Sequence, residues 1–153
     1  MKSKTFGLTL ALCFLATGAC FANPQMGTWK LNAAKSKLAR GSGKNNTVRY
    51  EQGFFRINVT IDGTDAKGKP THNEWSGNFD GKDCPVTGDP KSDARSYTRV
   101  NDGTLDFVIK KGGKVTAKGR IVIATDGKSR TVTSWAPNSK GKWVRSTAVY
   151  DKA

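Results

Sequence analysis

The sequence predicts an all-β protein, an antiparallel up-and-down β-barrel of about eight or nine strands with one short N-terminal helix. Short segments in which apolar and polar residues alternate follow one another from residue 27 to the end. Asp-Gly and Gly-Gly pairs separate them, and these pairs tolerate the positive φ angles of tight hairpin turns. No gap holds a helix long enough for a parallel crossover. A two-sheet sandwich is the alternative architecture.

The expected strands are short and differ in how clearly they alternate. The clearest begins at Phe55, where Phe55, Ile57, Val59 and Ile61 share one face and polar residues occupy the other. Residues 82–90 contain two prolines and one glycine and show no alternation, so this stretch is expected to be irregular. The expected strands span residues 27–31, 47–52, 55–61, 71–79, 95–100, 105–110, 114–125, 130–135 and 142–151.

One helix is expected between the first two strands, over residues 32–41. Asn32 can accept hydrogen bonds from the first free amides of such a helix. Gly41 suits the left-handed conformation that commonly ends a helix.

Residues 1–22 are expected to be a signal peptide, followed by a single domain over residues 23–153. Lys2 and Lys4 precede an apolar run over residues 6–16, and small residues lead to a cleavage site after Ala22. The run is shorter than the ~20 residues that a membrane-spanning helix needs, so no transmembrane segment is expected in the mature chain. The protein is therefore expected to be exported, periplasmic or secreted. Cleavage before a lipid-bearing Cys20 is the alternative.

The remaining chain is strongly basic and carries one cysteine. Removal of residues 1–22, which hold two lysines and no acid, lowers the net charge from +14 to +12. Such a surface attracts polyanions without base specificity, so a possible anionic envelope surface is an expected partner and a specific nucleic acid is not. Cys84 is left without an internal partner, so stability must come from the core.

Catalysis and metal binding have little support in the sequence, and no cofactor is expected. His72 is the only histidine, and its neighbour Glu74 shares a face that is expected to meet solvent. Lys82 can lower the pKa of the Cys84 thiol, but an inert half-buried thiol is the favoured interpretation. One histidine and one distant cysteine do not make a metal site. The protein is therefore predicted not to be an enzyme.

The two ends of the domain resemble the calycin superfamily of lipocalins, fatty-acid-binding proteins and avidins. The resemblance rests on Gly27-Thr28-Trp29-Lys30-Leu31 at the start and on residues 147–153 at the end. It is closest to small exported bacterial lipocalin-like proteins. It implies a barrel that holds a small ligand, with Gly27 and Trp29 closing one end and Arg145 packing against the indole.

Two departures from the superfamily bear on the ligand. Fatty-acid-binding proteins carry an Arg-x-Tyr pair in the last strand, where this chain has Ala148 and Tyr150. The missing cation favours neutral or weakly polar ligands. Asn32 and Ser36 lie one place too far from Trp29 to match the biotin contacts of avidins.

Aromatic residues near mid-strand are expected to line a cavity, since aromatic walls with a few polar groups are usual for small-ligand sites. Gly77 and Gly119 would leave room inside the barrel. A barrel filled by its own side chains is the alternative. The expected ligand-binding residues are Tyr50, Phe55, Trp75, Tyr97, Phe107, Arg120, Trp135 and Tyr150.

The sequence therefore predicts an exported, non-enzymatic binding protein with a small apolar or amphipathic ligand in a β-barrel. The alternative function is a basic envelope-associated protein with a filled core, which binds lipid headgroups or polysaccharide.

Overall fold

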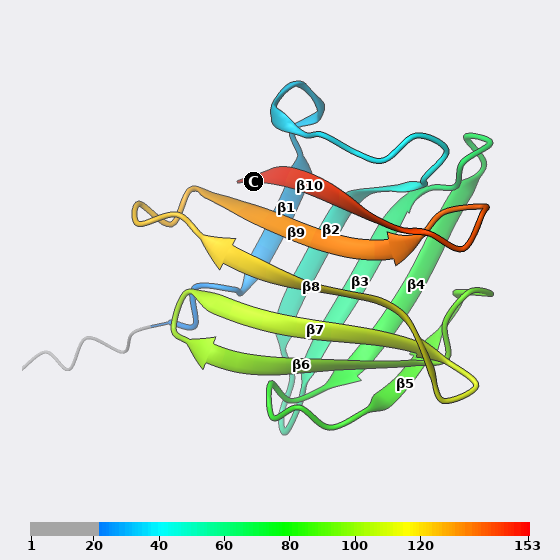
Figure 1. Cartoon of the computed structure of the whole chain (residues 1–153). Helices are drawn as coiled ribbons and strands as arrows, with labels where there is room; N and C mark the ends of the chain where they lie inside the picture. The colour runs from blue at the N-terminus through cyan, green and yellow to red at the C-terminus, as the bar shows by residue number, and fades with distance from the viewer. Residues whose placement is uncertain (1–21) are drawn as a thin grey trace, which may run out of the picture.

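The computed structural model describes residues 22–153, in which ten antiparallel strands close into a barrel (Figure 1). Neighbouring strands around the barrel follow the order of the chain, and β1 closes it by pairing with both β2 and β10. Residues 1–21 of the expected signal peptide lie outside the described residues. The strands are β1 Gly27–Leu31, β2 Lys44–Gln52, β3 Ile57–Thr64, β4 Pro70–Gly77, β5 Cys84–Thr87, β6 Ala94–Asn101, β7 Thr104–Lys111, β8 Lys114–Ile123, β9 Ser129–Pro137 and β10 Trp143–Lys152.

The strand count is one or two higher than expected, and the additional strand is β5. This segment has four residues and includes Pro85, which cannot donate a ladder hydrogen bond. Its pairing is correspondingly brief, with Trp75 opposite Val86 on one side and Cys84 opposite Arg95 on the other. A strand this short shows no readable alternation, which is why the sequence indicated an irregular stretch.

The expected helix over residues 32–41 was wrong in extent. Only η1 (Ala33–Lys35), a single 3-10 turn, forms there. Asn32 does cap it, with its side-chain oxygen accepting from the Lys35 amide at 3.2 Å. The turn ends because the following backbone bonds to β10 instead. Lys37 pairs with Thr147 through two backbone hydrogen bonds, at 2.7 and 2.8 Å.

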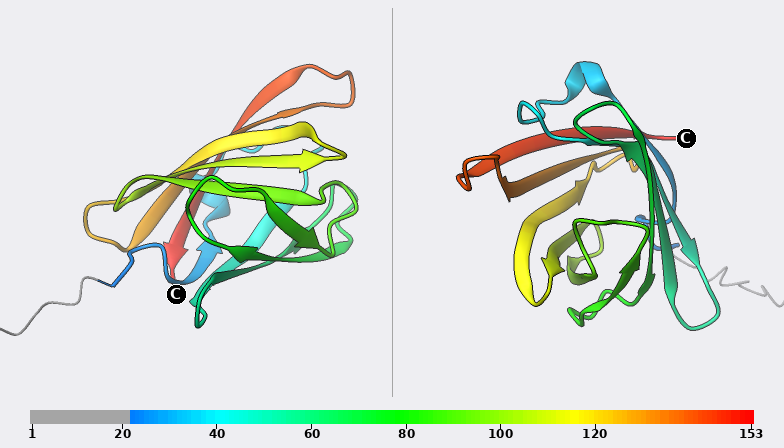
Figure 2. Two further views of the ribbon diagram at one scale, coloured as in Figure 1. Left: turned by 90° about the horizontal axis from the view of Figure 1, so that it is seen from below. Right: turned by 90° about the vertical axis from the view of Figure 1, so that its right-hand side faces the viewer.

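The barrel has two ends with different connections. Residues 22–26 enter at the N-terminal end, together with the β2–β3, β4–β5, β6–β7 and β8–β9 connections. The opposite end, called the basic end below, carries the β1–β2, β3–β4, β5–β6, β7–β8 and β9–β10 connections. Seen from this side the strands form a ring, with η1 outside it near β10 (Figure 2, right).

Alternation along the strands fills the barrel interior with large side chains. In β3, Ile57, Val59 and Ile61 are buried, as the sequence predicted, while the intervening residues face outward. Trp29 is fully buried, and its indole nitrogen donates to the Gln25 carbonyl at 2.9 Å. The strand pattern from residue 22 onward thus accounts for the core without a helix. The other buried apolar residues are Val48, Tyr50, Trp75, Val86, Tyr97, Leu105, Phe107, Ile121, Ala148 and Tyr150.

Candidate functional site in the barrel interior

A small cavity of about 70 Å³ lies inside the barrel. Four of the expected ligand-binding residues line it, namely Tyr50, Tyr97, Phe107 and Tyr150. A water molecule occupies roughly 30 Å³ in the liquid, so the space holds about two waters or one small chemical group. It is well below the roughly 300–1,000 Å³ of pockets that enclose a whole drug-sized ligand.

Packed aromatic rings explain why the interior is nearly filled. Tyr97 lies at the centre of the cluster, with its ring centroid 4.9 Å from that of Trp75. Tyr50 and Phe107 lie at 6.3 Å and Phe79 at 5.7 Å from the same ring, in edge or tilted geometries. Edge-to-face packing of this kind is favourable and fixes the orientation of each ring. The interior is therefore rigid around the small space that it leaves.

Arg130 is enclosed by three aromatic rings at this cavity. It belongs to β9 and is only 2% exposed. Its guanidinium carbon lies 4.8 Å from the ring centroid of Trp29, 4.9 Å from that of Tyr50 and 5.1 Å from that of Tyr150. Its Nε and Nη1 atoms are buried and have no hydrogen-bond partner. The cation is thus held by ring faces, while two of its nitrogens are left unbonded.

Arg145 was expected to occupy this position, and that expectation was wrong. Arg145 faces outward on β10, where its guanidinium lies 5.9 Å from the ring of Trp135. Arg130 stands directly opposite Tyr150 in the β9–β10 ladder. The barrel therefore does place an arginine beside the last-strand tyrosine, but from the neighbouring strand.

Arg95 is a second buried cation that lines the cavity. It belongs to β6 and is 3% exposed. Its Nη2 donates to the side-chain oxygen of Asn73 at 3.1 Å, whereas Nε and Nη1 have no partner. No aspartate or glutamate lines the cavity. Two buried guanidinium groups thus share one space without an acidic side chain to balance their charge.

Tyr50 and Tyr150 stay neutral at ordinary pH and do not supply that negative charge. Burial raises the pKa of Tyr150 to about 12, against a lowering effect of Arg130. Burial and the proximity of Tyr97 raise the pKa of Tyr50 still further. The Tyr150 hydroxyl donates to the Asn45 carbonyl at 3.0 Å. The site is therefore a positively charged, aromatic-walled space with neutral hydroxyl groups.

Of the eight expected ligand-binding residues, three were wrongly placed inside. Phe55 lies in the β2–β3 turn and is 82% exposed, because the buried alternation begins only at Ile57. Arg120 faces outward and pairs with Asp106 at 2.6 Å. Trp135 also faces outward. Arg130 faces inward, and a residue five positions further along β9 lies on the opposite face. Trp75 is buried as expected, but it bonds to the Arg95 carbonyl and does not line the cavity.

The space expected beside Gly77 and Gly119 is occupied by aromatic side chains of the protein itself. A side chain at Gly77 would meet the Trp75 ring at 2.5 Å, and one at Gly119 would meet the Phe107 ring at the same distance. Each glycine lets an aromatic ring fold flat over the backbone. The glycines therefore make space for the protein's own rings and not for a ligand.

Sequence reasoning missed Arg95, Arg130 and their neighbour Asn73. The alternation of inward and outward side chains along each strand could have identified the two arginines. Arg95 lies two residues before Tyr97, and Arg130 two before Val132, so each shares the inward face of its strand. Charged residues are almost never fully buried without a partner, so residue type does not indicate that either arginine lies inside. Asn73 gave no comparable signal.

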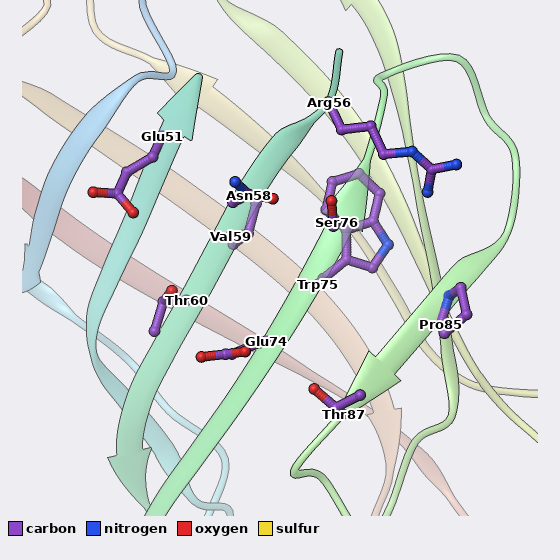
Figure 3. A pocket seen from close by; sticks show the side chains of 10 residues that line it. All are labelled: Glu51, Arg56, Asn58, Val59, Thr60, Glu74, Trp75, Ser76, Pro85 and Thr87. Atoms are coloured by element: carbon purple, nitrogen blue, oxygen red, sulfur yellow. The ribbon is translucent and has the colours of Figure 1, made fainter. Parts of the chain in front are cut away.

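The outer wall over β2–β5 holds a separate polar hollow of about 500 Å³ (Figure 3). Of the residues labelled there, Val59 and Trp75 are buried in the core. The acidic and basic groups of the hollow are Glu51, Arg56 and Glu74. Glu74 also contacts His72 at 3.3 Å, and His72 contacts Asp62 at 2.7 Å on the other side. These groups are exposed, as expected for His72. Within residues 22–153, no cluster of three or more possible metal ligands is found.

Comparisons with known proteins found matches among solved structures. No protein-family model matches the sequence, and no curated protein matches it. One structural match is described as "Structure of a redesigned beta barrel, mFAP1, bound to DFHBI", at 16% identity and TM-score 0.46, covering 84% of this chain and 95% of that one. Another is "Structure of EF1p2_mFAP2b bound to DFHBI", at 12% identity and TM-score 0.45, covering 85% and 94%. The closed antiparallel barrel fits a calycin-like fold, and membership of that superfamily stays a resemblance. Over the described part of the chain, no helix is long and apolar enough to cross a bilayer.

Proposed function

We propose that this protein binds a small molecule through an acidic group that enters the barrel between Arg95 and Arg130. One observation carries the proposal: four buried guanidinium nitrogens, two on each arginine, have no hydrogen-bond partner. Removing an ion from water costs several kcal/mol even after the protein relaxes, unless an opposite charge compensates it. A bound carboxylate would supply that charge and accept the unused N–H groups.

The size of the cavity limits which part of the ligand is enclosed. About 70 Å³ accommodates a carboxylate or a similarly small anionic group. A longer apolar or amphipathic portion requires the aromatic side chains to rearrange. The earlier preference for neutral ligands rested on the absence of a cation beside Tyr150, and Arg130 removes that premise. The ligand class proposed is therefore a small acid.

Thermal unfolding in the presence of sodium acetate, butyrate and octanoate at constant ionic strength tests this function. Each acid should raise the melting temperature by mass action, whereas butanol and octanol should not. Arg130→Gln and Arg95→Gln should each remove the shift, and Arg49→Gln, at an exposed position on β2, is the matched control that keeps it. Equal shifts from acids and alcohols, or a shift that persists in both inner variants, would contradict the proposal.

A second candidate function, docking on an anionic surface, is favoured by the unequal charge of the two barrel ends. The connections at the N-terminal end carry Arg56, Lys82 and Lys128 against four aspartates. Those at the basic end carry three aspartates, each of which bonds to backbone amides. The cations at the basic end are Lys35, Lys37, Arg40, Lys67, Lys69, Lys91, Lys140 and Lys142.

Both candidate functions are proposed for the exported, non-enzymatic protein that the sequence indicates. Export predicts cleavage after Ala22, so N-terminal sequencing of material recovered outside the cytoplasm should begin at Asn23. A start at a lipidated Cys20 would assign the protein to the membrane surface instead.

A further inference from the structure

The outer wall of the barrel carries a groove of about 540 Å³ between two tryptophans. It is lined by Lys118 on β8, Trp135 on β9 and Trp143 on β10. Both indoles lie outside the closed core, with 36% of Trp135 and 44% of Trp143 exposed. Packing of the barrel interior therefore does not account for two large aromatic residues at these positions.

Cations alternate with these indoles across the strands. Lys118 stands directly opposite Trp135, which in turn stands opposite Arg145. The Arg145 guanidinium lies 5.9 Å from the Trp135 ring, and the Lys118 ammonium lies 6.0 Å from the Trp143 ring. Because all four residues belong to paired strands, the strand ladder sets their backbone positions before any partner binds.

The surroundings of the groove are positive. Trp143 follows directly on the β9–β10 connection, where Lys140 and Lys142 belong to the basic end. The only acidic residue in β8, β9 and β10 is Asp151, at the far end of β10. Arg120 is neutralised by Asp106 on β7, but no such partner faces Lys118 or Arg145 among the described residues. The groove is thus complementary to a negatively charged partner whose rings can stack on the two indoles.

We propose that this groove binds an acidic polysaccharide chain. Sugar rings would stack on Trp135 and Trp143, and carboxylate groups along the chain would pair with Lys118 and Arg145. Lys118, Trp135 and Trp143 line a groove on the strands of the barrel wall, and a groove fits a chain better than it fits the surface of a bilayer. Polysaccharide is the ring-bearing polyanion available to an exported protein. This inference rests on the second candidate function and names its site and partner.

Isothermal titration of the full purified protein with polygalacturonate tests the inference, with neutral dextran as the uncharged control. Trp143→Ala and Trp135→Ala should each weaken binding about tenfold, as expected for the loss of one stacked ring. Lys118→Gln combined with Arg145→Gln should weaken it further and reduce its dependence on salt. Val122→Ala, at an exposed apolar position on β8, is the matched control and should bind normally. Circular dichroism confirms that each variant is folded.

The possible results distinguish binding in the groove from docking on an anionic surface through the basic end. Polygalacturonate binding that the tryptophan variants leave unchanged, but that Lys67→Gln with Lys69→Gln reduces, would overturn the groove and keep docking through the basic end. Tighter binding to single-stranded oligonucleotide or to anionic vesicles than to polygalacturonate would overturn the proposed partner. Absence of all three interactions would overturn both the groove and the second candidate function. Acid binding inside the barrel is measured independently through Arg130→Gln.

Discussion

The Arg130 guanidinium lies 4.8 Å from the ring centroid of Trp29, although the two residues are about a hundred positions apart in the chain. Trp29 is fully buried on β1, and Arg130 comes from β9, two strands away around the barrel. A desolvated cation over an indole face is stabilised by about 2 kcal/mol. The contact links β1 to β9. Arg130 also lines the cavity, and its Nε and Nη1 atoms have no hydrogen-bond partner.

Truncation of Trp29 should therefore destabilise the whole barrel. Trp29→Ala is expected to lower the free energy of unfolding by about 3–5 kcal/mol, because it empties a large buried site and removes the stacking surface of Arg130. Melting followed by circular dichroism measures the effect. Trp143→Ala, which removes a half-exposed indole, is the control and should change stability little. A Trp29→Ala protein that melts like the parent would show that the indole does not support the core.

Phe107 is buried and Phe55 is exposed, so the same substitution to alanine should cost much more stability at Phe107 than at Phe55. Phe107→Ala removes a ring that packs against Tyr97 and Gly119, and should cost about 3–5 kcal/mol. Phe55→Ala changes a side chain in an exposed turn and should cost less than about 0.5 kcal/mol. Urea unfolding of both variants provides the comparison. Equal losses would mean that Phe55 is buried after all.

Burial of the cavity tyrosines predicts loss of stability in alkaline solution. Tyr150 has an ordinary pKa of 10.0, which the folded protein raises to about 12. The neutral form is favoured by folding, so its contribution is complete below pH 10 and is lost as the pH rises from there toward 12. Denaturation at several pH values across this range measures the decline. Tyr150→Phe should show a shallower decline, and an unchanged slope would contradict the prediction.

His72 should titrate above its ordinary value. Hydrogen bonds to Asp62 and then to Glu74 raise the pKa of its imidazole above 6.5. The charged imidazole supports the fold below pH 6.5, and this support is lost as the pH rises through the raised value. Proton NMR of the single histidine gives its midpoint directly. Asp62→Asn should move that midpoint downward, whereas Asp106→Asn on another part of the wall should not.

The interior of this barrel shows where sequence patterns are informative. Alternation identified β3 correctly, with Ile57, Val59 and Ile61 buried, because a strand places every second residue on one face. The same rule failed at Phe55, since a turn interrupts the alternation just before Ile57. It also missed β5, where four residues and a proline offer too little pattern.

The burial of two arginines could not be predicted from residue type. Arg95 and Arg130 occupy inward positions by parity, but neither was among the expected site residues. Cations are almost never fully buried without a partner, so residue type by itself favours the surface. Arg145 was chosen to cover Trp29 because it lies in the last strand. The structure gives that role to Arg130 because strand register, and not position along the chain, determines which residue faces Trp29.

The sequence by itself determined that this protein is all-β with antiparallel neighbours, because strand alternation and turn glycines act over a few residues. It also determined the excess of positive charge, which is a property of composition. Closure into a barrel rather than a two-sheet sandwich was decided by the pairing of β1 with β10. Only the tertiary structure decided that the interior is nearly filled, that two arginines face the remaining cavity and that Trp135 lies outside with Trp143. These features depend on ladder register and ring packing between strands distant in the chain, and no local pattern encodes them.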